Sequence, residues 1–273
     1  MPAGRQRYFV GSRAGCQRYE GAMSAVAAEP VIRIRGLKKE FMLSHSGAGS
    51  LKTALLWWKR RQLERFVALK GVDLDVMPGE CVALVGRNGA GKSTLLSLLS
   101  RIYKPTSGSV EVDGRIAPLL ELGAGFHPDL TGIENVLFNG IILGLTRKQV
   151  NERMAQIVEF AGLEHHIDAP VRTYSSGMLA RLGFSVAAHV DADVLIVDEV
   201  LAVGDYAFEQ KCYSYIEEFR KQGGTILFVS HNMDSVRRIA DRCVWLKHGE
   251  VMMSGLPDEV IQAYQADGDA GNI

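Results

Sequence analysis

The chain has 273 residues, of which 47% are hydrophobic, enough for the core of one sizeable α/β domain or two small ones. Its 31 basic residues balance 31 acidic ones, so no net charge attracts nucleic acid over long range, and we expect no nucleic-acid partner. No apolar run approaches the roughly 18 residues that cross a bilayer. The four cysteines stand singly without a CxxC pair, which favours free thiols in a reducing cytosol over disulfides or zinc.

The first 22 residues carry four arginines among glycine and alanine, without periodicity and without the apolar segment of a signal peptide. We interpret residues 1–28 as a disordered tail. Because Met23 begins a more natural approach to the first strand, we hypothesise that it is the true start. A basic arm that contacts phosphate or lipid is the alternative interpretation.

Hydrophobic patterning predicts the first elements of the folded part. The alternating run at 31–37 predicts a half-buried strand, and the segment at 51–66 is compatible with a helix. A strand and a turn are expected over 67–80, followed by a buried strand at 81–86 that ends in glycine. The next helix is expected to begin near Lys92.

The second half of the chain alternates between helical and strand patterns. An amphipathic helix is predicted at 147–161 and another helix at 178–190. Short apolar runs at 194–199 and 225–230 flank a helical segment, which is the alternation of a mostly parallel sheet. The remaining predictions are a hairpin at 243–255 and a terminal helix near 257–265.

The stretch GRNGAGKS, from Gly86 to Ser93, fits the pattern GxxxxGK[ST] between an apolar strand and a helix. Its glycines let backbone N–H groups surround phosphate oxygens, Lys92 supplies positive charge to the β and γ phosphates, and Ser93 offers a hydroxyl to Mg²⁺. A chance match in a glycine-rich turn is the alternative, but the flanking elements favour nucleotide binding. The predicted nucleotide contacts are Gly86, Asn88, Gly89, Ala90, Gly91, Lys92, Ser93 and Thr94.

Two acids end the apolar run VLIVDE. Asp198 stands where a carboxylate reaches the Mg²⁺ shell, and Glu199 can polarise a water toward the γ-phosphate. Alone, the run would suggest two solvated acids, but the upstream phosphate loop favours the catalytic interpretation. His231 follows the next apolar strand and is expected to reach the same phosphate, because parallel strands direct their carboxyl ends at one crevice.

In this order, GRNGAGKS, YSSGM, VLIVDEVLAVGD and VSHN resemble the nucleotide-binding domain of an ABC transporter over residues 31–265. The resemblance implies an α/β fold with a RecA-like P-loop NTPase core, an antiparallel β subdomain and an inserted α-helical subdomain at about 115–189. The domain is expected to occupy 29–265, with 266–273 as a C-terminal tail. ATP and Mg²⁺ are the implied ligands of a homodimer, paired head to tail beneath an integral membrane permease.

The resemblance also gives roles to single residues. It places Tyr174–Met178 at the signature motif, Asp205 in the loop that communicates between the two sites, Phe41 at the adenine-stacking position and His231 at the switch histidine.

Three small residues of the signature motif invite a physical explanation. Ser175, Ser176 and Gly177 at a helix N-terminus offer unpaired N–H groups and partial positive charge to a triphosphate held by the other subunit. A plain capped turn is the alternative interpretation.

The sequence departs from the common family pattern before the helical region. Glu121 stands near the position of a glutamine that usually bridges Mg²⁺ and the membrane-facing groove, and we hypothesise that turnover is slow until the permease is engaged. As a group, ELGAGFHPDLTG, TYSSGM and DEVLAVGD resemble ATPases that export O antigen, capsule or teichoic acid. The implied cargo is a lipid-linked polysaccharide, and the implied place is the cytoplasmic face of the bacterial inner membrane.

Some members of that group carry an additional carbohydrate-binding domain after the ATPase, and we expect it to be absent here because the chain stops shortly after IQAYQ. The segment with Trp57 and Trp58 carries five basic residues, which fits either a surface helix on the β subdomain or contact with lipid or the permease. The alternatives for function are an ABC exporter of another substrate, a non-transport ABC ATPase, and a regulatory module that binds ATP without hydrolysis.

Overall fold

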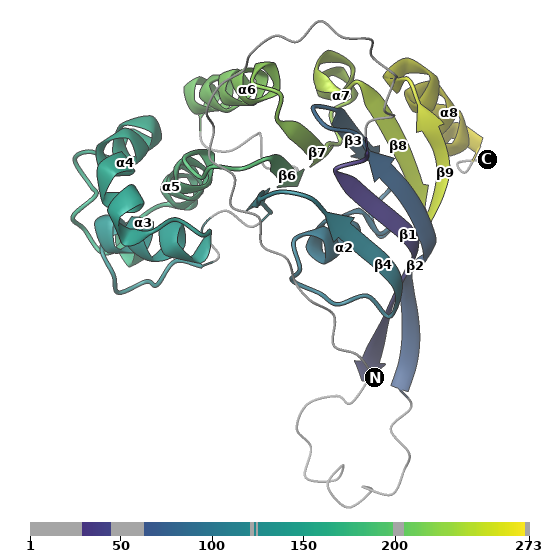
Figure 1. The fold of residues 1–273 in the computed structure, drawn as a ribbon, viewed down its shortest axis with the longest axis horizontal. Coiled ribbons are helices and arrows are strands. Elements are labelled where there is room, and N and C mark those ends of the chain that lie inside the picture. The colour runs from purple at the N-terminus through teal and green to yellow at the C-terminus, as the bar shows by residue number, and fades with distance from the viewer. Residues whose placement is uncertain (1–28, 45–62, 121–122, 124, 199–204, 271–273) are drawn as a thin grey trace, which may run out of the picture.

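The structure is a computed structural model that describes residues 29–44, 63–120, 123, 125–198 and 205–270. Two sheets share one end of the molecule with α2 and α6–α8, and a group of three helices forms the other end (Figure 1). The strands are β1 (Ile32–Ser44), β2 (Leu63–Val76), β3 (Cys81–Val85), β4 (Ser107–Val112), β5 (Ile116–Leu119), β6 (Val194–Asp198), β7 (Thr225–Val229), β8 (Arg242–Lys247) and β9 (Glu250–Gly255). The helices are α2 (Lys92–Leu99), α3 (Gly132–Ile142), α4 (Arg147–Ala161), α5 (Ser176–Ala188), α6 (Tyr206–Lys221), α7 (Met233–Ile239) and α8 (Pro257–Ala270), with a short 3-10 turn at Val171–Thr173.

The larger sheet has the order β5-β6-β7-β3-β8-β9. Its first five strands are parallel and β9 is antiparallel. Side chains alternate along each strand, so Val82 and Leu84 of β3 point to one face while Cys81, Ala83 and Val85 point to the other. Both faces are covered, which explains why these strands read as continuous apolar runs.

The smaller sheet is antiparallel, in the order β2-β1-β4. Its apolar face packs with α2 against one face of the larger sheet, and Leu95, Leu96 and Leu99 of α2 are fully buried there. The strand β2 begins at Leu63, so the helix prediction for 51–66 is wrong for its last four residues. Their pairing with β1 explains the difference, since Leu63 to Phe66 lie opposite Phe41 to Ser44 in the ladder. The rest of that segment, with Trp57 and Trp58, lies outside the described residues.

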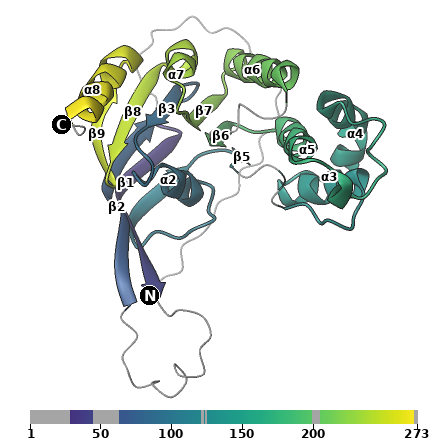
Figure 2. The same cartoon turned by 180° about the vertical axis from the view of Figure 1, so that it is seen from behind.

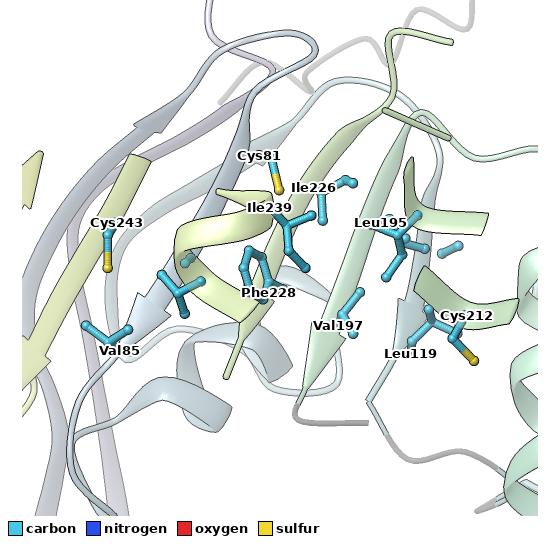
Figure 3. Packing of buried hydrophobic residues seen from close by; sticks show 14 of the residues in the cluster. Cys81, Val85, Leu119, Leu195, Val197, Cys212, Ile226, Phe228, Ile239 and Cys243 are labelled. Carbon is cyan, nitrogen blue, oxygen red and sulfur yellow. The ribbon is translucent and has the colours of Figure 1, made fainter. Parts of the chain in front are cut away.

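The second core lies on the opposite face of the larger sheet, beneath α5, α6, α7 and α8 (Figure 3). It contains three thiols, Cys81, Cys212 and Cys243, which are free and buried. Burial raises the pKa of each of these thiols to about 12. The prediction of free thiols is confirmed for these three cysteines, whereas Cys16 lies outside the described residues.

The helices α3, α4 and α5 pack around a third core at the end of the molecule opposite α8 (Figure 2). Both α3 and α4 begin with a capping box, formed by Thr131 with Glu134 and by Thr146 with Gln149. The inserted helical region was expected from about 115, but β5 pairs with β6 in the larger sheet, so Arg115–Leu119 leads into the core rather than the helical group. At the other end, α8 continues to Ala270, past the expected boundary at 265.

No helix in the described parts of the chain is long and apolar enough to cross a membrane. The expected disordered tail at 1–28 and the proposed start at Met23 fall in the part of the sequence that the structure does not describe.

Candidate nucleotide site

The phosphate loop follows β3, which lies between β7 and β8 in the larger sheet. Its backbone is packed so closely that glycine is required at two positions. A Cβ on Gly86, where φ is 151°, would lie 2.2 Å from the carbonyl oxygen of Leu246 in β8. A Cβ on Gly91, where φ is 107°, would lie 2.8 Å from the carbonyl oxygen of Ala68 in β2. The loop is therefore seated on backbone from both sheets, which fits a cradle for phosphate.

Lys92 is the first residue of α2 and is 6% exposed. Its ammonium donates to the carbonyl oxygens of Gly86 at 2.7 Å and Arg87 at 3.2 Å, so the charge is held inside the curve of the loop. Ser93 follows on the exposed side of the first helical turn. The loop thus combines a cation, a hydroxyl and the N–H groups of a helix start, the kinds of group that bind a triphosphate.

A cavity of about 340 Å³ lies against the loop. It is lined by Phe66 and Ala68 of β2 together with the loop and the start of α2, from Asn88 to Thr94. Phe41, the aromatic predicted to stack on adenine, is the direct cross-strand partner of Phe66. Its ring meets Tyr103 edge-on, with ring centres 5.4 Å apart, and Lys39 Nζ lies 4.9 Å from its centre.

Phe66 was not among the residues predicted from the sequence. It falls in the segment interpreted as helical, and its exposure and its pairing with Phe41 exist only in the folded sheet. Directly paired residues of antiparallel strands project to the same face, so Phe41 lies on the same face of the smaller sheet as Phe66, which lines the cavity.

The predicted acidic and histidine residues follow strands that lie next to one another. Asp198 ends β6 and pairs with Val229 of β7, which in turn pairs with Leu84 of β3 two residues before the loop. His231 follows β7 and is exposed. Asp198, His231 and the phosphate loop therefore share the carboxyl edge of the sheet, as predicted. Glu199 lies outside the described residues.

The signature motif opens α5 in the helical group. Ser175 is the N-cap residue, and its Oγ accepts a hydrogen bond from the Met178 N–H at 3.2 Å. Tyr174 is buried, and its hydroxyl donates to the His166 carbonyl oxygen at 2.6 Å, which anchors the start of the helix. Ser175 and Ser176 are exposed. The capped turn of the alternative interpretation is present, and the N-terminus of the capped helix is exposed.

Asp205 is placed at the N-terminus of α6, where its Oδ1 accepts a hydrogen bond from the Phe208 N–H at 2.9 Å. Its other oxygen lies 3.8 Å from Nη1 of Arg181 on α5. This ion pair joins the start of α6 to the signature helix, so the two predicted interface segments are connected within one chain.

A phosphate loop after a central parallel strand, with an acid at the end of a nearby strand, defines a P-loop nucleotide-binding protein. The sequence pattern described as ABC transporter matches residues 69–202. The chain belongs to the ABC transporter family, in the group of ATP-binding subunits, and it is an ATPase.

Its relatives include ATP-binding proteins of polysaccharide exporters. It is 50% identical over 241 residues to the O-antigen export system ATP-binding protein RfbB of Klebsiella pneumoniae, covering 87% of this chain and 98% of the relative. It is 40% identical over 236 residues to the teichoic acids export ATP-binding protein TagH of Shouchella clausii, covering 86% of this chain and 65% of that relative.

Solved structures establish the fold independently. The dimeric ATP-binding cassette MJ0796 bound to ADP and Pi is similar with a TM-score of 0.67 at 21% identity, covering 83% of this chain and 98% of that one. The predicted ABC ATPase fold is confirmed.

Proposed function

We propose that this ATPase drives export of a lipid-linked surface polysaccharide, such as O antigen, capsule or teichoic acid, through a separate integral membrane permease. It would work as a homodimer at the cytoplasmic face of the bacterial inner membrane. Support for the cargo comes from the 50% identity to an O-antigen export protein over nearly its whole length.

The observation that carries the mechanism is the separation of two half-sites in one chain. The cavity at the phosphate loop is lined by β2, the loop and α2, whereas the exposed start of α5 belongs to the helical group. A head-to-tail dimer brings the signature helix of one protomer over the phosphate loop of its partner. Ser176 and Gly177 then offer N–H groups and the positive end of the α5 dipole to the γ-phosphate.

The residues at the sheet edge fit a magnesium ion bound with ATP. Ser93 provides a neutral hydroxyl and Asp198 a carboxylate, which are oxygen ligands of the kind that Mg²⁺ prefers. The close packing of Gly86 and Gly91 keeps the loop free of side chains where phosphates approach. Mg²⁺ supplies charge neutralisation between the phosphates when bound.

Hydrolysis and adenine recognition are assigned to neighbouring groups. Glu199 orients and deprotonates the attacking water, and His231 contacts the γ-phosphate from the end of β7. Phe66, which lines the loop cavity, and its cross-strand partner Phe41 provide aromatic faces for the adenine ring.

The face of α3 supports contact with a permease. Four large apolar side chains of this helix are 37–61% exposed, namely Ile133, Phe138, Ile141 and Ile142. An exposed apolar helix face of this kind fits a partner protein. Because α3 packs on α4 and α5, a permease held there would move with the signature helix.

Mixing two inactive variants tests the composite site. Lys92→Ala removes the phosphate-loop cation and leaves the signature helix intact, whereas Ser176→Arg blocks the signature helix and leaves the loop intact. Each variant alone is expected to hydrolyse ATP at background rate. Their mixture should recover activity, because a mixed dimer has one site with Lys92 from one protomer and Ser176 from the other.

An inactive mixture of well-folded variants would show that both motifs serve the same chain, contrary to the proposal. The cargo is tested separately by placing Lys92→Ala in the native host. Lipid-linked polysaccharide should then accumulate inside the cell, and unchanged surface polysaccharide would favour the alternative of an ABC exporter for another substrate.

A further inference from the structure

The hairpin of β8 and β9 turns beside the phosphate loop through two residues, His248 and Gly249. Both have positive φ, 50° and 83°, as a type I′ turn requires. The Gly249 N–H donates to the carbonyl oxygen of Ala90 in the loop at 2.9 Å, and the Gly249 carbonyl oxygen accepts from the Lys70 N–H of β2 at 2.9 Å. The turn therefore connects the phosphate loop to β2 through main-chain hydrogen bonds.

Close packing fixes this arrangement on both sides. A Cβ on Gly249 would lie 2.6 Å from the carbonyl oxygen of Ala68, so the turn rests directly on β2. A Cβ on Gly86, at the start of the loop, would lie 2.2 Å from the carbonyl oxygen of Leu246, a buried residue of β8. A displacement of the β8–β9 turn would therefore displace the loop backbone that surrounds the phosphates.

The terminal helix α8 holds the residue just before the turn. Lys247 Nζ lies 2.5 Å from Asp267 Oδ1, and these two side chains are 34% and 32% exposed. Trp245 and Tyr264 pack beside this pair, with ring centres 6.0 Å apart. The ammonium of Lys247 also lies 5.9 Å from the centre of the Trp245 ring. The contact thus combines a half-buried ion pair with aromatic packing.

A cavity of about 590 Å³ separates the last turns of α8 from the phosphate loop. Arg87, Asn88 and Ala90 of the loop line one side, and Tyr264 and Asp267 of α8 line another. Lys247 and His248 of the β8–β9 hairpin also line this cavity, between the loop and α8. The Lys247–Asp267 pair is the polar part of the connection between this hairpin and α8.

We propose that Asp267 is a positioning residue for nucleotide binding. Through Lys247 and the Gly249–Ala90 hydrogen bond, α8 holds the phosphate loop in the conformation that binds phosphate. The inference rests on ATP binding at the phosphate loop. Preorganisation of a binding loop raises affinity by lowering the ordering cost on binding. Loosening α8 should therefore weaken nucleotide affinity and leave the chemical step unchanged, because Asp198 ends a different strand, β6.

The test reverses the charge of Asp267 and compares it with a second charge reversal on the same helix. Asp267→Lys places two cations together, whereas Asp258→Lys breaks the ion pair between Asp258 Oδ1 and Arg237 Nε, which are 2.9 Å apart at the start of α8. The control is the harsher change for the helix itself, because it puts a cation at the helix N-terminus. ADP affinity by calorimetry, KM and kcat for ATP, and melting temperature are measured for each protein.

Asp267→Lys should raise the dissociation constant for ADP and the KM for ATP by about threefold, the scale of a partly exposed ion pair, with kcat unchanged. Asp258→Lys should leave both values unchanged. The double variant Lys247→Asp with Asp267→Lys restores the pair in reverse and should restore ADP affinity. If Asp267→Lys does not fold, Asp267→Asn carries the same comparison with the milder loss of charge.

Unchanged ADP affinity in folded Asp267→Lys would overturn the proposal. So would an equal loss in Asp258→Lys, which would reveal a general effect of helix stability, or a double variant that fails to recover. A parent protein that binds no ADP would instead contradict nucleotide binding at the loop, and the two failures are therefore distinguishable.

Discussion

Asn135 shows how one buried side chain sets the entrance to the helical group. It is fully buried in α3 beneath the preceding loop. Its Oδ1 accepts from the His127 N–H at 2.7 Å, and its Nδ2 lies 3.1, 3.1 and 2.9 Å from the carbonyl oxygens of His127, Leu130 and Thr131. One buried amide therefore makes hydrogen bonds to several main-chain groups of the preceding loop.

Replacing Asn135 with aspartate keeps the shape of the side chain but replaces the Nδ2 donor with an oxygen that can only accept hydrogen bonds. An oxygen would then face three carbonyl oxygens inside the protein, and we expect a loss of about 3 kcal/mol in the free energy of unfolding. Urea unfolding measures the loss. The matched control is Asn139→Asp one turn later, where only one donated bond, to the Asn135 carbonyl oxygen, is replaced. Equal losses in the two variants would contradict the role given to Asn135.

At this scale the sequence predicts residues whose chemistry and spacing form a motif. Lys92 and Asp198 could be placed at the sheet edge because a loop pattern and a strand end fix their positions. The role of Asn135 could not be predicted, because the sequence does not distinguish a buried asparagine from an exposed one. Its burial depends on how the preceding loop folds over it. Phe66 was missed for a related reason, since its pairing with Phe41 is a long-range contact across β1 and β2.

In the proposed dimer, the start of α5 has two roles. Ser175 caps the helix through the Met178 N–H, as an ordinary N-cap does, and it is also exposed where a partner's phosphate would approach. A serine hydroxyl can accept from the helix and donate to an anion at the same time. The observed cap and the proposed phosphate clamp are therefore compatible in the same residue.

Aspartate at this position separates the two roles. Ser175→Asp retains an oxygen for the cap, so we expect stability to change by less than about 0.5 kcal/mol. It also puts negative charge against the γ-phosphate, and ATP-driven dimerisation should be lost. Ser175→Ala is the complementary variant and should cost about 1 kcal/mol of stability. Size-exclusion chromatography with ATP in a Glu199→Gln background, beside thermal unfolding, checks both; dimerisation by Ser175→Asp would count against the clamp.

Elements with strong local signals were predicted best. The helix at 147–161 matches α4 to the residue, because Thr146 caps its start and Gly162 ends it in a left-handed conformation. By contrast α3, β5 and α7 were not predicted. The helix α3 exposes apolar residues and so lacks a clear polar face. The strand β5 has only four residues, including Pro118, and the helix α7 has only seven, so both are too short for a clear periodic pattern. Their identity depends on packing against other elements rather than on local pattern.

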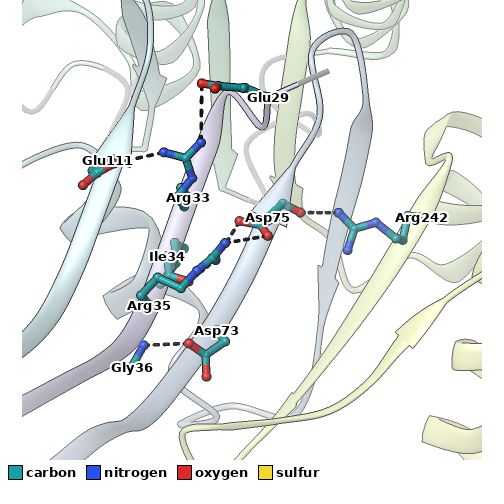
Figure 4. A network of polar contacts seen from close by, with 9 residues as sticks. All are labelled: Glu29, Arg33, Ile34, Arg35, Gly36, Asp73, Asp75, Glu111 and Arg242. Carbon is teal, nitrogen blue, oxygen red and sulfur yellow. Dashed lines mark hydrogen bonds and ion pairs between the residues drawn. The ribbon is translucent and has the colours of Figure 1, made fainter. Parts of the chain in front are cut away.

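At the scale of the whole molecule, Arg242 connects the two sheets by hydrogen bonds. Arg242 of β8 donates to the Asp75 carbonyl oxygen of β2 at 2.6 Å, and Asp75 in turn holds Arg35 of β1 (Figure 4). The Nε of Arg242 also lies 2.5 Å from Oε1 of Glu80, the residue just before β3. Its Nη1 lies 2.9 Å from Oγ of Ser254 in β9. The contacts span β1, β2, β3, β8 and β9, which position the phosphate loop.

The overall architecture followed from the sequence, but the connections between its parts did not. Four ordered motifs predicted the ABC ATPase fold, because three of them contain or follow strands of the parallel sheet and the fourth, YSSGM, opens the signature helix α5. The Glu80–Arg242 pair joins residues 162 apart in sequence. The ion pair between Lys247 and Asp267 likewise joins two different elements, β8 and α8. Such contacts have no local signature, since either residue alone resembles a solvated surface charge.

The Glu80–Arg242 pair predicts how stability depends on pH. Burial acts to raise the pKa of Glu80, but hydrogen bonds from Arg242 and from the Met77 N–H hold that pKa below its ordinary value. A carboxyl group with a lowered folded-state pKa contributes stability above its unfolded pKa, and this contribution is lost as the pH falls through the folded pKa. Glu80→Gln should therefore cost about 1–2 kcal/mol at pH 7.

Below about pH 4 the difference between parent and Glu80→Gln should shrink, because the protonated parent carries no charge at this position either. Urea unfolding of both proteins from pH 7 to pH 3 measures the convergence. Glu111→Gln is the control, since Glu111 is exposed and its Arg33 partner lies 3.3 Å away at the surface. It should change stability little at any pH. A Glu80→Gln deficit that stays constant over the range would mean that packing, rather than the charge on Glu80, stabilises the junction of the two sheets.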